Sequence, residues 1–149
     1  MKKIIAIIGS LSGRSSNKAI VNHIAGLAAD KLDIDIYDGI RDLPQFNPDL
    51  DDENPPNSVV EFRQRVRDCD GVLISTPEYI FGVPGALKNA LDWTVSTADF
   101  REKPVALIVA STSGEKAYES LLFTLQTIEL TDVRSSFRTL KQRSESMVR

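Results

Sequence analysis

The sequence predicts an α/β fold in which a doubly wound parallel sheet carries helices on both faces. Short apolar runs rich in β-branched residues alternate along the chain with segments whose apolar residues recur at helical spacing. Strands that alternate with helices pair in parallel, and right-handed crossovers place the helices on both faces. The 149 residues contain no internal repeat or linker, so we expect a single domain, irregular from about residue 131.

Four strands are predicted from two patterns. Continuous apolar runs at Ile4–Ile8, Val72–Ile74 and Val105–Val109 are typical of strands buried on both faces. Leu32–Tyr37 alternates apolar residues with Asp, which indicates a strand with one solvent-facing side at the edge of the sheet. A fifth strand would come either from Asp132–Leu140 or from a partner subunit, and the sequence leaves both alternatives open.

Helices are predicted between these strands. The first, third and fourth are expected at Ser16–Lys31, Val83–Thr94 and Glu115–Leu130. The second begins with the capping-box sequence Ser58–Glu61 and continues to about Cys69. The Pro- and Asp-rich segment Gly39–Asn57 is expected to be a loop anchored by Leu43 and Phe46, and its acidic run Asp49–Glu53 is expected to be solvated.

The edge position of Leu32–Tyr37 predicts the strand order 2-1-3-4-5, which is the flavodoxin-like arrangement. The direction of winding reverses between strands one and three, and ligands of such sheets bind outside the carboxyl ends of the strands at that reversal. Gly9–Asn17 and Ser75–Tyr79 leave these two strands, so they are expected to lie side by side.

Composition excludes several classes of function. A net charge of −3 gives no basic surface for nucleic acid or an anionic membrane. Cys69 is the single cysteine, so an intrachain disulfide and a cysteine zinc cluster are excluded, and it is expected to be a small buried hydrophobe. His23 has no metal-ligating residue at suitable spacing, and no metal site is predicted. The apolar run near the start is too short for a signal peptide, which favours the cytoplasm.

The first loop, GSLSGRSSN at Gly9–Asn17, surrounds Arg14 with hydroxyl groups directly before a helix. Free N–H groups at a helix N-terminus bind anions, and Ser hydroxyls and an Arg can add contacts to phosphate oxygens. The loop matches neither the dinucleotide fingerprint nor the P-loop. A small-residue turn with Ser15 or Ser16 as N-cap explains it equally well.

The second loop follows the third strand and reads PEYIFG. Pro77 turns the chain out of the sheet, and the backbone of Glu78–Ile80 can then offer hydrogen bonds to the edge of a flat heterocycle. Tyr79 and Phe81 supply apolar area for such a ring, and Gly82 allows close approach. A phosphate cradle beside a ring-binding turn is what a mononucleotide needs.

The two loops resemble those of the NAD(P)H-dependent FMN reductase and quinone reductase family. Pro77–Trp93 is similar to the family's PEYxxGxPGxLKNAxDW almost position for position. The first loop is similar to GSxRxxSxN, with Ser12 in the place of the arginine and Arg14 two places further on. The resemblance extends over residues 1–114, and only Gly114 remains of the family's third, glycine-rich loop.

The resemblance implies bound FMN and hydride transfer from NADPH or NADH through the flavin to a quinone, free flavin, azo compound or metal ion. The protein itself would supply no acid or base. The cofactor-binding residues implied are Ser10, Ser12, Arg14, Ser15, Ser16 and Asn17 at the phosphate, Pro77, Glu78, Tyr79, Ile80, Phe81 and Gly82 along the isoalloxazine, and Ser111, Ser113 and Gly114 beneath it. The helix Ala86–Trp93 implies a homodimer or homotetramer.

Two other classes of protein fit the sequence less well. An FMN electron carrier would have a Ser/Thr-Gly-Thr-rich loop and a strongly acidic surface, and a receiver domain would have acidic residues where Gly9 and Ser10 stand. A catalytically silent flavin-binding regulatory protein stays open. The carboxylate of Glu78 is expected to face water, and Leu87 and Trp93 are expected in the core or at a dimer interface.

Overall fold

The computed structural model describes residues 1–128 in full and residues 133–139 as backbone. It contains one parallel sheet in the order β2-β1-β3-β4-β5. The strands are β1 Lys2–Ile8, β2 Leu32–Tyr37, β3 Gly71–Thr76, β4 Val105–Ser111 and β5 Val133–Thr139. The predicted order is confirmed, and the chain itself supplies the fifth strand. The remainder of the tail expected to be irregular, residues 131–132 and 140–149, lies outside the described residues.

The helices are α1 Ser16–Leu27, α2 Asn57–Arg67, α3 Gly85–Asp92 and α4 Glu115–Thr127, and short 3-10 turns lie at Gly39–Asp42 and Pro48–Leu50. Each helix ends two to four residues before its predicted bound, and α3 also begins later than predicted. α1 ends at Leu27, because a turn closed by the Ala28 carbonyl, which accepts from the Leu32 N–H at 2.8 Å, leads directly into β2. α3 begins after Pro84 and not at Val83 as predicted. Val83 precedes a proline, and the proline ring disfavours helical backbone angles at the residue before it.

The predicted capping box at Ser58–Glu61 is also wrong. α2 begins one residue earlier, at Asn57, and its N-cap is Pro56, which makes no side-chain capping bond. The Pro56 carbonyl accepts the N–H groups of Val59 and Val60 at 2.9 and 3.1 Å. The fixed backbone angle of proline therefore starts this helix, and Ser58 lies inside the first turn.

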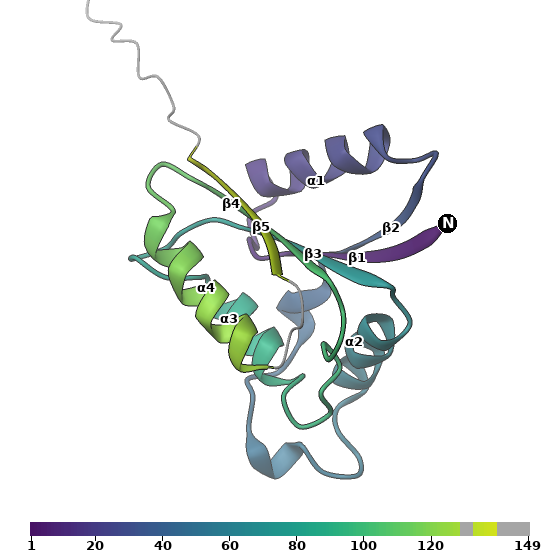
Figure 1. The fold of residues 1–149 in the computed structure, drawn as a ribbon. Coiled ribbons are helices and arrows are strands. Elements are labelled where there is room, and N and C mark those ends of the chain that lie inside the picture. Colours follow the sequence, from purple (N-terminus) through teal and green to yellow (C-terminus); the bar gives the residue numbers. More distant parts are fainter. Residues whose placement is uncertain (129–132, 140–149) are drawn as a thin grey trace, which may run out of the picture.

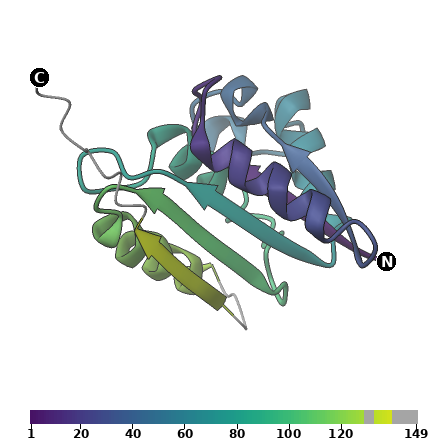
Figure 2. The same ribbon diagram turned by 90° about the horizontal axis from the view of Figure 1, so that it is seen from above.

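Helices cover the two faces of the sheet unequally. In Figure 1, α1 lies on one face, and α2, α3 and α4 lie on the other. The three-helix face holds the larger core cluster, whereas the α1 face holds a smaller one built on Ala6, Ile8, Val21 and Leu73. Figure 2 shows β4 and β5 beside α1 and not beneath it. The prediction that β4 is buried on both faces is therefore wrong at Ala106, which is exposed.

The loop between β2 and α2 is fastened to α3. The Asn89 side chain accepts from the Phe46 N–H at 2.7 Å and donates to the Pro44 carbonyl at 2.9 Å, and the Trp93 indole donates to the same carbonyl at 2.8 Å. Leu43 and Trp93 are buried, and the Phe46 ring meets Trp93 edge-on at 5.1 Å. The predicted anchors and the core position of Trp93 are confirmed.

One acidic residue of that loop is not solvated as predicted. Asp51 forms an ion pair of 2.6 Å with Arg63, and both side chains are almost fully buried. None of the helices among the described residues is both long and apolar enough to cross a membrane.

Candidate functional site

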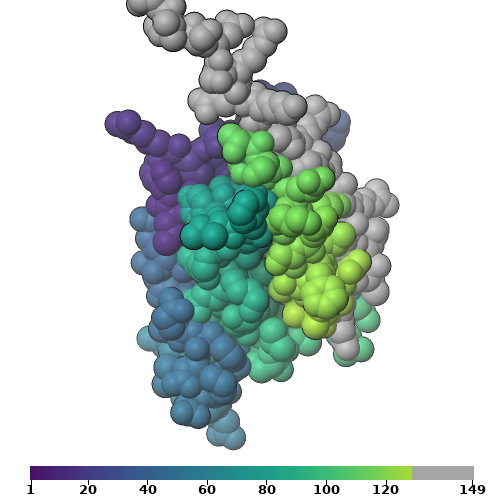
Figure 3. Space-filling view, turned by 90° about the vertical axis from the view of Figure 1, so that its left-hand side faces the viewer, coloured from purple at the N-terminus to yellow at the C-terminus, as the bar shows by residue number. Residues whose placement is uncertain are grey.

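The two predicted loops leave neighbouring strand ends. Ile8 of β1 lies opposite Ser75 of β3, and the N–H of Gly9 donates to the Ser75 carbonyl at 2.8 Å. A Cβ atom at Gly9 would lie 2.5 Å from Oγ1 of Thr76, so only glycine fits where the two strands diverge. In Figure 3 a purple segment from the first part of the chain, the teal β3–α3 segment and the green start of α4 share one face.

The first loop ends in a capped helix. Ser15 is the N-cap of α1, and its hydroxyl accepts from the Lys18 N–H at 3.4 Å. The N–H groups of Ser16 and Asn17 belong to the first turn, where a helix supplies no carbonyl partner. These groups and the partial positive charge of the helix end can hold an anion.

Serine hydroxyls give this loop its shape. The Ser10 hydroxyl accepts from the Ser12 N–H, and the Ser12 hydroxyl accepts from the Arg14 N–H, both at 3.3 Å. Because each hydroxyl accepts in these contacts, its own proton can be donated to a ligand. Ser12 and Arg14 are exposed and Ser10 is buried, so the loop presents the Ser12 hydroxyl and the Arg14 guanidinium to solvent near the helix end.

Asn17 is buried, whereas its neighbours Ser16 and Lys18 are exposed or half-buried. It is only 2% exposed, and its side chain accepts from the Ser75 hydroxyl at 3.0 Å and reaches the Ala110 carbonyl at 3.5 Å. The amide group therefore joins the start of α1 to β3 and β4. Because the side chain is buried, the backbone N–H of Asn17 is the group that suits the predicted phosphate contact.

The second loop contains a tight turn with unusual residues. Tyr79 and Gly82 exchange two backbone hydrogen bonds of 2.9 and 3.0 Å, and the central residues Ile80 and Phe81 have φ of 47° and 58°. Positive φ at both central positions defines a type I′ turn, for which Asn-Gly is the favoured sequence. A β-branched residue there is strained, and such strain is concentrated at functional sites.

The side chains of this turn form an apolar tip. Tyr79 is 52% exposed, Ile80 98% and Phe81 75%. The turn's own bonds use the N–H groups of Tyr79 and Gly82, so ring-edge donors from this segment would have to come from its other residues. The aromatic area predicted for a flat ring is present and faces outward.

Glu78 is half-buried, and its carboxylate, which was expected to face water, also bonds to the β4–α4 loop and to α4. Its Oε1 accepts from the Ser113 hydroxyl at 2.7 Å, and its Oε2 accepts from the Ala117 N–H at 2.9 Å. These bonds, the Ala117 N–H first, lower the pKa of the Glu78 carboxyl. The one sequence signal for this contact was Gly114, a residue before α4 that has no side chain to cap the helix.

The β4–α4 loop completes the same edge of the sheet. Ser111 ends β4 and is half-buried, Ser113 is exposed, and Gly114 is buried with φ of 68°. The positive φ explains why this glycine is present. All three stretches of predicted site residues therefore lie at the carboxyl ends of β1, β3 and β4.

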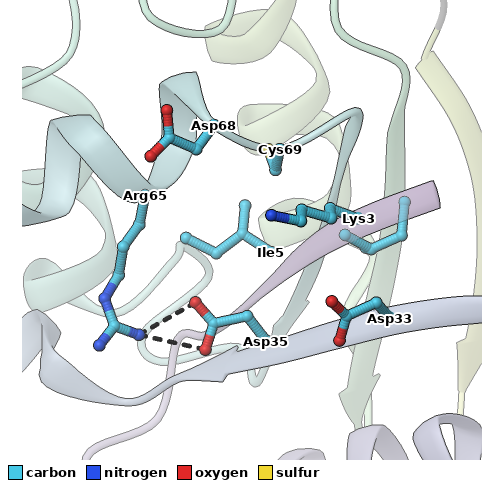
Figure 4. A pocket seen from close by; sticks show the side chains of 8 residues that line it. Lys3, Ile5, Asp33, Asp35, Arg65, Asp68 and Cys69 are labelled. Carbon is cyan, nitrogen blue, oxygen red and sulfur yellow. Dashed lines mark hydrogen bonds and ion pairs between the residues drawn. The ribbon is translucent and has the colours of Figure 1, made fainter. Parts of the chain in front are cut away.

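A charged hollow at the other end of β1 does not offer comparable chemistry. Lys3, Asp35, Arg65 and Cys69 are among the residues that line it (Figure 4). Arg65 donates to both carboxylate oxygens of Asp35 at 3.1 and 3.0 Å, and burial raises the pKa of the Cys69 thiol, so that it stays protonated. Among the described residues, no group of three His, Cys, Asp or Glu could hold a metal ion.

Fold and site together define a doubly wound α/β domain with a capped helix N-terminus and an aromatic turn at its topological switch point. The chain belongs to the NADPH-dependent FMN reductase family, whose match extends over residues 2–143. The resemblance predicted from the two loops is thereby confirmed.

Individual relatives agree with this membership. The chain is 34% identical over 116 residues to the NADH-dependent flavin reductase subunit 2 of Lactobacillus johnsonii, which covers 75% of the chain and 61% of the relative. It is 33% identical over 133 residues to an NAD(P)H-dependent FMN reductase of Pseudomonas aeruginosa, covering 88% and 71%. The chain thus spans about three fifths of the length of the first of these relatives and about seven tenths of the second.

A solved structure shares the fold closely. The flavoenzyme NAD(P)H:(acceptor) oxidoreductase FerB of Paracoccus denitrificans superimposes with a TM-score of 0.84 at 29% identity. The superposition covers 99% of this chain and 84% of the other.

Proposed function

We propose that the protein is an FMN-dependent oxidoreductase that takes hydride from NADPH or NADH and passes it to a small acceptor. The observation that carries this proposal is the exit of a hydroxyl-lined helix N-terminus and an aromatic turn from the adjacent strands β1 and β3. Bound FMN would supply the hydride chemistry, and the protein would supply binding, orientation and exclusion of water.

The residues present fit this cofactor. A phosphate would be held by Ser10, Ser12, Arg14, Ser15, Ser16 and the backbone of Asn17, since hydroxyl, guanidinium and helix N–H donors all suit a dianion. The ring would lie between the turn Pro77–Gly82 and the loop with Ser111, Ser113 and Gly114. Tyr79 and Phe81 offer exposed aromatic area there, and no acid or base from the chain is required.

The electron acceptor is proposed to be a quinone, a free flavin, an azo compound or a metal ion. The names of relatives support the first two, since they include a quinone reductase of Escherichia coli and a flavin reductase. The donors of the Ser10–Asn17 loop support the binding of an anionic cofactor, and they do not favour one of these acceptors over another.

A homodimer or homotetramer that works in the cytoplasm is part of the proposal. The apolar tip at Ile80 and Phe81 supports assembly, because large apolar side chains exposed together on a turn usually meet another surface. α3 already uses Leu87, Ala90 and Leu91 in its own core, so a subunit contact would have to use its remaining side.

The test is titration of the purified apoprotein with FMN and with riboflavin, followed by NADPH oxidation in the presence of a quinone. We expect a visible flavin spectrum, tighter binding of FMN than of riboflavin, and bleaching on addition of NADPH. Bound flavin that NADPH does not reduce would favour the silent regulatory protein. Failure to bind either flavin would overturn the proposal.

A further inference from the structure

Glu78 connects two loops that the sequence separates by more than thirty residues. It follows Pro77 and directly precedes the type I′ turn, and its carboxylate reaches the Ser113 hydroxyl and the Ala117 N–H. The contacts join the β3–α3 turn to the first turn of α4. The backbone pairing of β3 with β4 ends at Thr76 and Val109, so beyond these residues the two loops are joined by side-chain contacts such as those of Glu78.

The carboxylate supplies what the start of α4 lacks. The N-cap of this helix is Gly114, which has no side chain to accept from the first N–H groups. A carboxylate that accepts the Ala117 N–H fills this role from another part of the chain and also meets the positive end of the helix. With its pKa lowered, the carboxyl stays ionised at neutral pH.

The turn itself needs support from outside. Ile80 and Phe81 hold left-handed backbone angles although neither is glycine, and their side chains are exposed and give little packing in return. Strained conformations persist when surrounding contacts hold the chain in place. Glu78 is the side chain of this segment that fastens its beginning to a helix.

We propose that Glu78 is a positioning residue that holds the aromatic turn and the β4–α4 loop at a fixed separation. It acts through its two hydrogen bonds and contacts no reacting atom. This inference rests on the proposed function, because the fixed separation would set the width of the slot for the flavin ring. A preorganised slot binds its ligand without the cost of ordering two loops.

The experiment compares Glu78→Ala, Glu78→Gln and Ser113→Ala with Glu115→Gln, the matched control that removes a negative charge from the first turn of the same helix. Amide hydrogen exchange at Ala117, Tyr79 and Gly82 is measured in each apoprotein, together with the FMN dissociation constant. For Glu78→Ala we expect all three amides to exchange faster and the dissociation constant to rise roughly tenfold.

The variants should form a series. Glu78→Gln keeps one oxygen acceptor and should recover part of both effects, Ser113→Ala should show a smaller effect in the same direction, and Glu115→Gln should match the wild type. If Glu78→Ala speeds exchange at Ala117 alone and FMN binding is unchanged, Glu78 is only a helix cap and the inference is wrong. If the wild type binds no FMN, the proposed function fails, while exchange at Tyr79 and Gly82 still decides whether Glu78 holds the turn. Should the alanine variant not fold, Glu78→Gln and Ser113→Ala answer the same question.

Discussion

Two groups of polar residues in this molecule are built in opposite ways. Around Arg63, which is 4% exposed, the guanidinium donates to the Trp93 carbonyl and to Asp51, both at 2.6 Å, and to the Ser96 hydroxyl at 3.1 Å. At the carboxyl edge of the sheet, by contrast, Ser12 and Arg14 are exposed and face the solvent. The first group satisfies its polar atoms inside the protein, and the second leaves donors for a ligand.

The difference separates residues that maintain the fold from residues that bind. The Arg63 network joins α2 to the Asp51 loop and to the connection between α3 and β4, where buried Asp99 also pairs with Arg67 at 3.1 Å. Removal of a member should therefore change stability and leave ligand binding intact. Changes at the carboxyl edge should do the reverse.

The largest effect is expected for Arg63→Met. The substitution leaves Asp51 without its cation in a buried position, which costs about 3–5 kcal/mol. Arg65→Met is the matched control, because Arg65 lies on the same helix but forms a half-exposed pair with Asp35, which is worth roughly 0–1 kcal/mol. Urea unfolding measures both free energies. Equal losses in the two variants, or a loss of FMN affinity in folded Arg63→Met, would contradict the contrast.

The second largest effect is expected for Gly9→Ala, which should lower both the stability of the fold and the affinity for FMN. The added Cβ would lie 2.5 Å from Oγ1 of Thr76 and 3.0 Å from Leu87, so β1 and β3 must shift apart at their ends. We expect a loss of about 1–3 kcal/mol in unfolding free energy together with weaker FMN binding. Gly13→Ala is the control in the same loop, since its Cβ would meet nothing within 4 Å. A Gly13 variant as unstable as the Gly9 variant would rule out the steric explanation.

Arg14→Ala tests the open side of the contrast alone. The side chain is exposed, so the unfolding free energy should change by no more than about 0.5 kcal/mol. The FMN dissociation constant should rise roughly tenfold through loss of a charge-assisted bond to the phosphate. Riboflavin, which has no phosphate, should bind the variant and the wild type equally. A parallel loss of riboflavin affinity would place Arg14 elsewhere than at the phosphate.

The sequence predicted the fold because its strongest patterns are local. The apolar run Ile4–Ile8 predicts a buried strand, and the alternation in Leu32–Tyr37 predicts a strand with one exposed side. The strand order followed because the second of these must lie at the edge of the sheet. The position of Gly9–Asn17 directly after the first strand likewise predicted its place at the carboxyl edge. Both successes depend on residues that are close together in the chain.

The failures involve contacts between distant residues. Asp51 was expected in water because its neighbours are acidic, and only the fold brings Arg63 to it. The roles of Glu78, which reaches Ala117, and of Asn17, which reaches Ser75, were missed for the same reason. The left-handed angles of Ile80 and Phe81 could not be predicted either, because their residue types disfavour such a turn.

The smallest expected effect, and the most specific one, is the change in stability on acidification. Burial raises the pKa of Asp51, but the hydrogen bonds from Arg63 and Ser96 outweigh it, so that the folded-state pKa lies below the ordinary value of 3.8. A lowered folded-state pKa means that the stabilisation is complete above the unfolded-state value and is lost as the pH falls through the folded-state value. The asparagine in Asp51→Asn is uncharged at every pH. The difference in unfolding free energy between wild type and variant should therefore be constant from neutral pH to about 4 and should shrink at lower pH, where Asp51 becomes protonated. Urea unfolding of both proteins across this range gives that difference, in which the contributions of other carboxylates cancel. A difference that stays constant into strong acid would show that the Arg63–Asp51 contact stabilises the protein through packing and not through charge.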